Sequence, residues 1–176
     1  MFYIGVGNLE INKYNRKGFE LFIEAIKILE KKYDFEIVEF GNKEKLLINN
    51  SKTKIHSFGF LNNDQNLKNI YNAINILIVP SKLEAFGQVA SEAILCGTPV
   101  VCFSKTGLDD IIVNKKNGYL AKKFSSQELA KGIEFFLVKK NLNKDKVRYT
   151  IKDKFSYKKI SAEYIKIYNK ILNEKN

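Results

Sequence analysis

Two glutamates, Glu84 and Glu92, follow the apolar run that ends at Pro80-Ser81. Gly87 lies between them, where the backbone is expected to approach another group closely, and a helix is expected to begin just beyond. The unpaired N–H groups and the dipole of a helix start favour an anion, and phosphate is the obvious occupant. Glu92 should lie about two turns into that helix, up to about 12 Å along its axis, so the two acids cannot share one proton. They can hold two ends of an extended ligand.

The spacing of these acids leaves a simpler alternative open. Glu84 can be a favourable charge at a helix start, and Glu92 an ordinary solvent-facing residue on the helix that follows.

The elements that must position these acids alternate between strand and helix. Short apolar runs predict strands at 2–7, 35–40, 54–58, 76–79, 100–103 and 119–121, and helical spacing predicts helices at 19–29, 64–73, up to 96, 125–138 and 157–172. This order predicts an α/β fold with a doubly wound, Rossmann-like parallel sheet and a terminal amphipathic helix. The loops after Gly7, Gly59 and Val79 should then share one crevice beyond the carboxyl ends of the strands.

The chain of 176 residues carries a formal charge of +11, which favours an anionic partner. Arg16 and Arg148 are its only arginines, and this argues against nucleic acid because readers of base edges rely on the arginine fork. The lysines either form a solvated face or attract anionic substrate or an anionic membrane surface, with peripheral contact there.

Metal and membrane signals are weak in this sequence. His56 is the only histidine, which excludes a histidine-rich metal site, and Cys96 and Cys102 read as buried, reduced thiols. No stretch approaches the roughly 20 apolar residues that span a bilayer, and residues 1–7 resemble a strand rather than a signal peptide. We therefore expect a cytoplasmic protein.

The segment from Pro80 to Pro99 resembles the signature of the retaining glycosyltransferases of group 1, which have the two-domain GT-B architecture. Glu84 and Glu92 match that family's Glu-x7-Glu motif, and the flanking matches are Gly-Thr-Pro-Val at 97–100, Gly-Leu-Asp-Asp-Ile-Ile at 107–112 and Asn-Gly-Tyr-Leu at 117–120. The resemblance covers nearly the whole chain and begins at the first strand of the family's carboxyl-terminal domain. It implies a nucleotide-sugar-binding domain at 1–156 and, at 157–176, a helix that crosses to an amino-terminal domain missing from this sequence.

The resemblance also implies roles for single residues. Glu92 would bind the ribose hydroxyls, and Glu84 would contact the donor sugar near the reacting carbon. The backbone of the intervening turn would face the sugar and the diphosphate; it comprises Ala85, Phe86, Gly87 and Gln88.

Further matches concern the phosphates and the base. Lys17 matches the family lysine that neutralises the leaving diphosphate. The family usually has an arginine soon after the glycine matched by Gly7, whereas this chain has Asn8, so Arg16 is the candidate substitute. The backbone that would hold the nucleobase is Gly59, Phe60 and Leu61.

The implied reaction moves a sugar from a nucleoside-diphosphate sugar to an acceptor hydroxyl with retention of configuration, without a metal or other cofactor. The absent amino-terminal domain would supply the acceptor site, so this chain alone should be inactive. The local motif is most similar to transferases that build surface polysaccharide, such as capsule or lipopolysaccharide. Two alternatives are a non-catalytic module that binds nucleotide or anionic lipid, and a fragment of a nucleotide-sugar epimerase.

Overall fold

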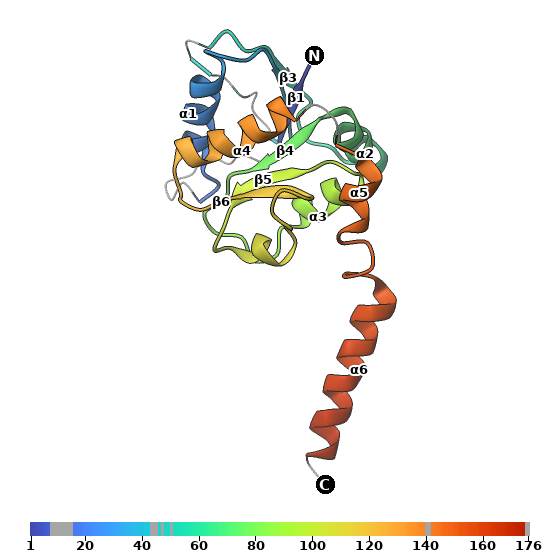
Figure 1. Cartoon of the computed structure of the whole chain (residues 1–176). Helices are drawn as coiled ribbons and strands as arrows, with labels where there is room; N and C mark the ends of the chain where they lie inside the picture. The colour runs from blue at the N-terminus through green and yellow to red at the C-terminus, as the bar shows by residue number, and fades with distance from the viewer. Residues whose placement is uncertain (8–15, 43–45, 47, 50, 140–141, 175–176) are drawn as a thin grey trace.

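A parallel sheet of six strands forms the centre of the structure (Figure 1). The structure is a computed structural model that describes residues 1–7, 16–42, 46, 48–49, 51–139 and 142–174. The strands are β1 (Tyr3–Gly7), β2 (Glu36–Phe40), β3 (Ile55–Ser57), β4 (Ile76–Val79), β5 (Val100–Phe103) and β6 (Gly118–Ala121), in the spatial order β3-β2-β1-β4-β5-β6. The order reverses between β1 and β4, which makes that boundary the switch point where ligands bind in such sheets. The predicted doubly wound sheet is confirmed.

The central strands are apolar on both faces because helices cover both faces. All four residues of β4 and all four of β5 are buried. In β1 the pairing places Ile4 beside Ile76 and Val6 beside Ile78, so neighbouring strands present matching apolar rows to the same layer. This is the pattern expected of a parallel sheet buried on both sides.

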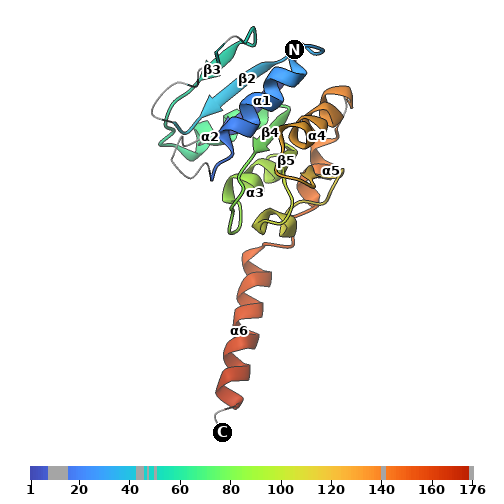
Figure 2. The ribbon, with the colours of Figure 1, turned by 90° about the vertical axis from the view of Figure 1, so that its left-hand side faces the viewer.

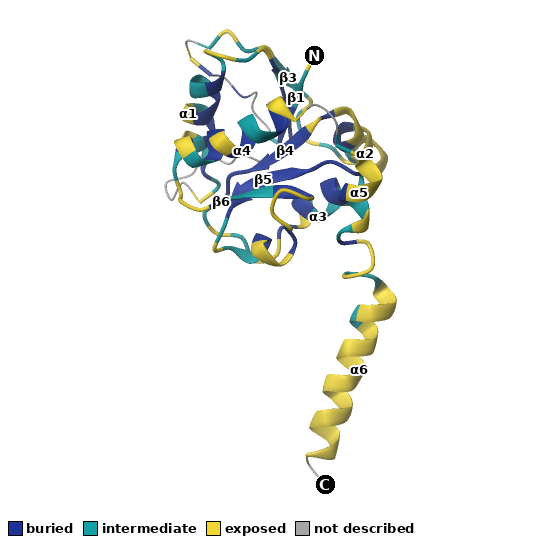
Figure 3. Ribbon diagram, viewed as in Figure 1, coloured by how far each residue is buried: buried dark blue, intermediate teal, exposed yellow. Residues whose placement is uncertain are grey.

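In the described part of the chain, five helices pack against the sheet in two layers (Figures 1 and 2). The bounds are α1 (Phe19–Leu29) and α4 (Ser126–Val138) on one face, and α2 (Asp64–Ala73), α3 (Gln88–Leu95) and α5 (Lys144–Tyr149) on the other. A 3₁₀ turn, η1 (Gly107–Asp110), follows β5. Each layer has its own core, and the strands between them are the most deeply buried part of the molecule (Figure 3).

Two sequence expectations need correction. Helix α5 was not predicted, because its six residues bury only Val147 and so show no helical periodicity. Glu92 was expected about two turns into its helix, but α3 begins at Gln88, and Glu92 is its fifth residue, a little over one turn from the start. The reason is that residues 84–87 are not helical and include a bend at 85–86.

The last helix, α6 (Tyr157–Asn173), projects from the rest of the molecule and buries no residue (Figures 1 and 3). It begins at Ser156, whose side chain accepts a hydrogen bond from the Lys159 N–H. Its apolar stripe is largely exposed rather than docked on its own domain: Ile160 is half-buried, and the other members, Tyr157, Tyr164, Ile167, Tyr168 and Ile171, are exposed, as are Ile165 and Leu172 of the same helix. Over the described residues, no helix has both the length and the apolarity needed to cross a bilayer.

Candidate nucleotide-sugar site

A groove runs along the carboxyl ends of β1 and β4 and continues between α2 and α3. It consists of three adjoining hollows with volumes of ≈ 120, 160 and 420 Å³. The first and second hollows share Gly7 and Val89, and the first and third share Gln88. Because they share walls, the hollows can hold separate parts of one elongated ligand.

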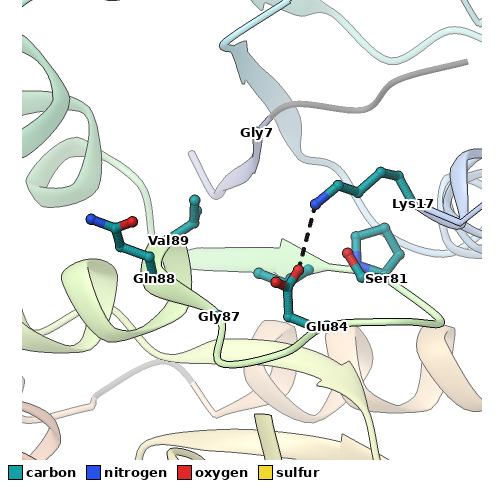
Figure 4. Close-up of a pocket in the computed structure, with 9 residues that line it drawn as sticks. Gly7, Lys17, Ser81, Glu84, Gly87, Gln88 and Val89 are labelled. Carbon is teal, nitrogen blue, oxygen red and sulfur yellow. Dashed lines mark hydrogen bonds and ion pairs between the residues drawn. The ribbon is translucent and has the colours of Figure 1, made fainter. Parts of the chain in front are cut away.

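Lys17 and Glu84 form a pair at the first hollow (Figure 4). The Lys17 Nζ lies 3.5 Å from the Glu84 Oε2, and the two side chains are 22% and 21% exposed. At this distance and exposure an ion pair contributes little stability. Both charges are therefore available to a ligand that enters the hollow.

Close backbone packing sets the positions of this pair. Gly18 is the N-cap of α1 and has a φ of 66°. A Cβ there would lie 2.0 Å from the Pro80 carbonyl oxygen, so the chain around Lys17 lies directly against the end of β4. On the other side, the Glu84 carbonyl accepts a hydrogen bond of 2.8 Å from the Gly107 N–H.

The start of α3 supplies the positive end of a helix dipole to the same hollow. Gly87 is the N-cap, has a φ of 89° and provides no side-chain cap, and the first turn of α3 contains no acidic residue. The Gly87 carbonyl accepts hydrogen bonds from the N–H groups of Ala90, at 3.0 Å, and Ser91. The N–H groups of Gln88 and Val89 therefore lie before the first hydrogen bonds within the helix. Since Gln88 and Val89 line the first hollow, this end of the groove suits an anion.

Glu92 lies in the third hollow, where its carboxylate is held by a buried tyrosine. The Tyr71 hydroxyl donates a hydrogen bond of 3.0 Å to the Glu92 Oε2. Burial, together with the Glu92 charge, raises the pKa of Tyr71 and keeps its proton available for donation.

The predicted nucleobase loop forms part of the second hollow. Phe60 and Leu61 line it beside Phe40 and Gly41. Gly59 does not line it, but its carbonyl accepts a hydrogen bond of 2.7 Å from the Gly41 N–H, which ties the loop to the end of β2. The end of β1 and the loops after β3 and β4 thus share one crevice, as predicted; residues 8–15 of the loop after β1 lie outside the described residues.

The structure brings most of the predicted residues together. Those that line the groove are Gly7, Lys17, Glu84, Gly87, Gln88, Glu92, Phe60 and Leu61. Arg16, Ala85, Phe86 and Gly59 do not line it, and Asn8 lies outside the described residues. Arg16 is exposed, and its carbonyl accepts a hydrogen bond of 2.9 Å from the Lys82 N–H. The Phe86 ring instead meets Phe155 edge-on, with centroids 5.2 Å apart.

Sequence reasoning missed Tyr71 and Val89, which line the groove. No local spacing points to Tyr71, because its link to Glu92 depends on how α2 packs on α3. The expectation for the cysteines needs one correction: Cys102 is buried, but Cys96 is half-buried and lines the third hollow. Within the described ranges, no group of three or more potential ligands among His, Cys, Asp and Glu could hold a metal ion, and metal-independence remains a prediction.

Known proteins of similar sequence are glycosyltransferases. The capsular polysaccharide biosynthesis glycosyltransferase CapM of Staphylococcus aureus is 28% identical over 178 residues, which cover 90% of this chain and 44% of CapM. The chain spans less than half the length of the first curated relatives, between 38% and 45%.

Solved structures extend the likeness to the fold. The carboxyl-terminal domain of the group 1 glycosyl transferase LpcC of Francisella tularensis superposes with a TM-score of 0.62 at 28% identity, covering 85% of this chain and 80% of that one. Anabaena HepE in complex with UDP-glucose has a TM-score of 0.74 at 19% identity and covers 96% of this chain and 49% of its own. Residues 6–153 match the family described as glycosyl transferases group 1. With the sheet, the groove and the Glu84–Glu92 motif in place, this match over most of the sequence establishes that the chain belongs to the group 1 glycosyl transferases.

Proposed function

We propose that this chain is the donor-binding half of a retaining glycosyltransferase that uses a nucleoside-diphosphate sugar. The observation that carries the proposal is the set of adjoining hollows, with Lys17, Glu84 and the start of α3 in one of them and Glu92 in another. The lysine and the helix dipole in the first hollow suit a diphosphate. The Glu92 carboxylate in the other hollow can accept hydrogen bonds from a ribose joined to that diphosphate. The bound UDP-glucose of HepE, which has the same fold, supports this class of ligand.

In this proposal each part of the donor has its own partner. Glu92 accepts hydrogen bonds from the ribose hydroxyls, and the backbone of Phe60 and Leu61 borders the base. The diphosphate lies against the start of α3, where Lys17 offsets the charge that develops on it as the sugar leaves. Glu84 faces the sugar, and Arg16 is the candidate second cation if its exposed side chain turns toward the groove.

The acceptor site would come from an amino-terminal domain, and α6 would cross to pack on it. Three observations support this: the exposed apolar stripe of α6, the half-length coverage of the curated relatives, and the carboxyl-terminal domain of LpcC as a structural match. Orientation of donor and acceptor between two domains would supply much of the catalysis, so residues 1–176 alone should transfer no sugar.

CapM supports a role in surface polysaccharide assembly, as capsule or lipopolysaccharide. We place this work in the cytoplasm, at the inner face of the cell membrane, where the charge of +11 would favour peripheral contact with anionic lipid. We propose neither nucleic acid nor a metal as a partner.

A thermal-shift screen against UDP, GDP, ADP and their sugars tests donor binding directly. A ligand that binds only the folded state raises the melting temperature by mass action. One nucleoside diphosphate should do so, and Glu92→Ala should weaken its binding more than Glu84→Ala. Loss of the ribose contact should cost about 1.5–3 kcal/mol.

Two further outcomes separate the alternatives. If none of the nucleotides raises the melting temperature, the donor-binding proposal fails. If nucleotide binds but no sugar is transferred or hydrolysed after an amino-terminal domain is joined, the chain is a non-catalytic binding module.

A further inference from the structure

Tyr71 lies where the second and third hollows meet and lines both of them. Tyr71 is only 2% exposed, yet its hydroxyl donates a hydrogen bond to Glu92 across the contact between α2 and α3. The nucleotide half of the groove is therefore built around this tyrosine.

Tyr71 is held in place through both its ring and its backbone. Its ring packs edge-on against Phe40, with centroids 5.8 Å apart, and its carbonyl accepts a hydrogen bond of 2.5 Å from the Thr98 Oγ1. A phenol donates one proton, and here it is donated to a single oxygen of Glu92. A carboxylate offers about four acceptor positions, so the others stay free for a ligand.

A glutamate on a helix samples several rotamers when nothing holds it, and fixing it on binding costs entropy. We propose that Tyr71 is a positioning residue for nucleotide recognition: its hydroxyl orders the Glu92 carboxylate in advance so that it can accept from the ribose hydroxyls. This inference rests on the proposed donor site. It adds a residue that acts on ribose binding through the Glu92 carboxylate.

The test compares ribose-containing and 2′,3′-dideoxy forms of UDP, GDP and ADP, by calorimetry on the 176-residue protein. Tyr71→Phe removes only the hydroxyl and should weaken binding of the preferred ribonucleotide about three- to tenfold, the effect of one hydrogen bond. The dideoxy form makes no contact with Glu92, so its affinity should not change. The preference for the ribonucleotide over its dideoxy form should therefore fall. General damage to the fold would weaken binding of both forms and would not lower this preference.

A matched control is available far from the groove. The Tyr33 hydroxyl donates to the Glu134 Oε1 at 2.8 Å, so Tyr33→Phe removes the same kind of bond between the α1–β2 connection and α4. It should leave both affinities unchanged. In a Glu92→Ala background, Tyr71→Phe should have no further effect, because its action passes through that carboxylate.

The possible outcomes distinguish a failure of the Tyr71 inference from a failure of the proposed donor site. If the unchanged protein prefers the ribonucleotide but Tyr71→Phe keeps the full preference, the positioning role is wrong while donor binding stands. If Tyr71→Phe weakens both forms equally, Tyr71 is merely structural and the inference is also overturned. If the unchanged protein binds none of the six nucleotides, the donor site fails, and this inference fails with it.

Discussion

At the scale of single residues, the groove places opposite charges next to each other. The Lys17 Nζ and the Glu84 Oε2 are 3.5 Å apart in the first hollow, and each side chain is about one fifth exposed. An anion that enters this hollow is attracted by the lysine and repelled by the glutamate. A sugar hydroxyl has the opposite preference, since it can donate to the carboxylate. The pair therefore suits a ligand with both groups.

This arrangement predicts that Lys17→Ala weakens binding of a nucleoside diphosphate about tenfold or more and leaves binding of the bare nucleoside nearly unchanged. The reason is the loss of a charge-assisted contact to phosphate. Arg16→Ala should act in the same direction. Lys131→Ala is the control, because Lys131 pairs with Glu128 on the exposed side of α4. Calorimetry in which Lys17→Ala binds the diphosphate like the parent protein would remove Lys17 from the site.

At the scale of elements, the site depends on how closely the start of α1 approaches the end of β4. Gly18 and Gly59 have nearly the same left-handed φ, 66° and 63°, but different surroundings. A Cβ on Gly18 would collide with the Pro80 carbonyl, whereas the nearest atom to a Cβ on Gly59 is 3.9 Å away. Substituting alanine at each of these two glycines therefore separates the cost of backbone strain from the cost of a steric collision.

We expect Gly59→Ala to cost about 1–2 kcal/mol of unfolding free energy, the usual strain of a left-handed residue with a side chain. Gly18→Ala should cost clearly more, because the start of α1 must also move away from β4 and carry Lys17 with it. Urea unfolding of both variants measures the difference. Equal costs would mean that α1 can shift freely and that its contact with β4 does not set the position of Lys17.

At the scale of the whole molecule, α6 is the element whose packing the rest of the chain does not explain. Its Ile167 is 54% exposed, whereas Ile133 in α4 is fully buried. Apolar stripes of this kind are commonly covered by a partner, and uncovered ones favour association. An amino-terminal domain is the partner that we propose.

The same substitution at the two isoleucines tests the packing of α6. Ile133→Ala should lower the unfolding free energy by about 2–5 kcal/mol, as for other buried large-to-small changes. Ile167→Ala should change it by no more than about 0.5 kcal/mol, as at exposed positions. A large loss at Ile167, measured at concentrations where the protein is monomeric, would show that α6 folds back onto its own domain.

Much of this architecture was predictable because its signals are local. Apolar runs at 76–79 and 100–103 marked buried strands, and the stripe at 157–172 marked a helix. The short span from Glu84 to Glu92 placed both acids around one helix, although Glu92 lies a little over one turn from its start rather than two. Helix α5 escaped prediction because a six-residue segment with one buried side chain has no periodic pattern.

The sequence by itself determined the order of the strands and of the helices other than α5, the acids of the motif and the helix start that favours an anion, since each depends on neighbours along the chain. The tertiary structure decided which distant residues meet. The parallel pairing of β1 with β4 brings Lys17 to Glu84, 67 residues away, and the packing of α2 on α3 brings Tyr71 to Glu92, 21 residues away. Such contacts leave no spacing signal, because they depend on strand order and on side-chain packing between layers.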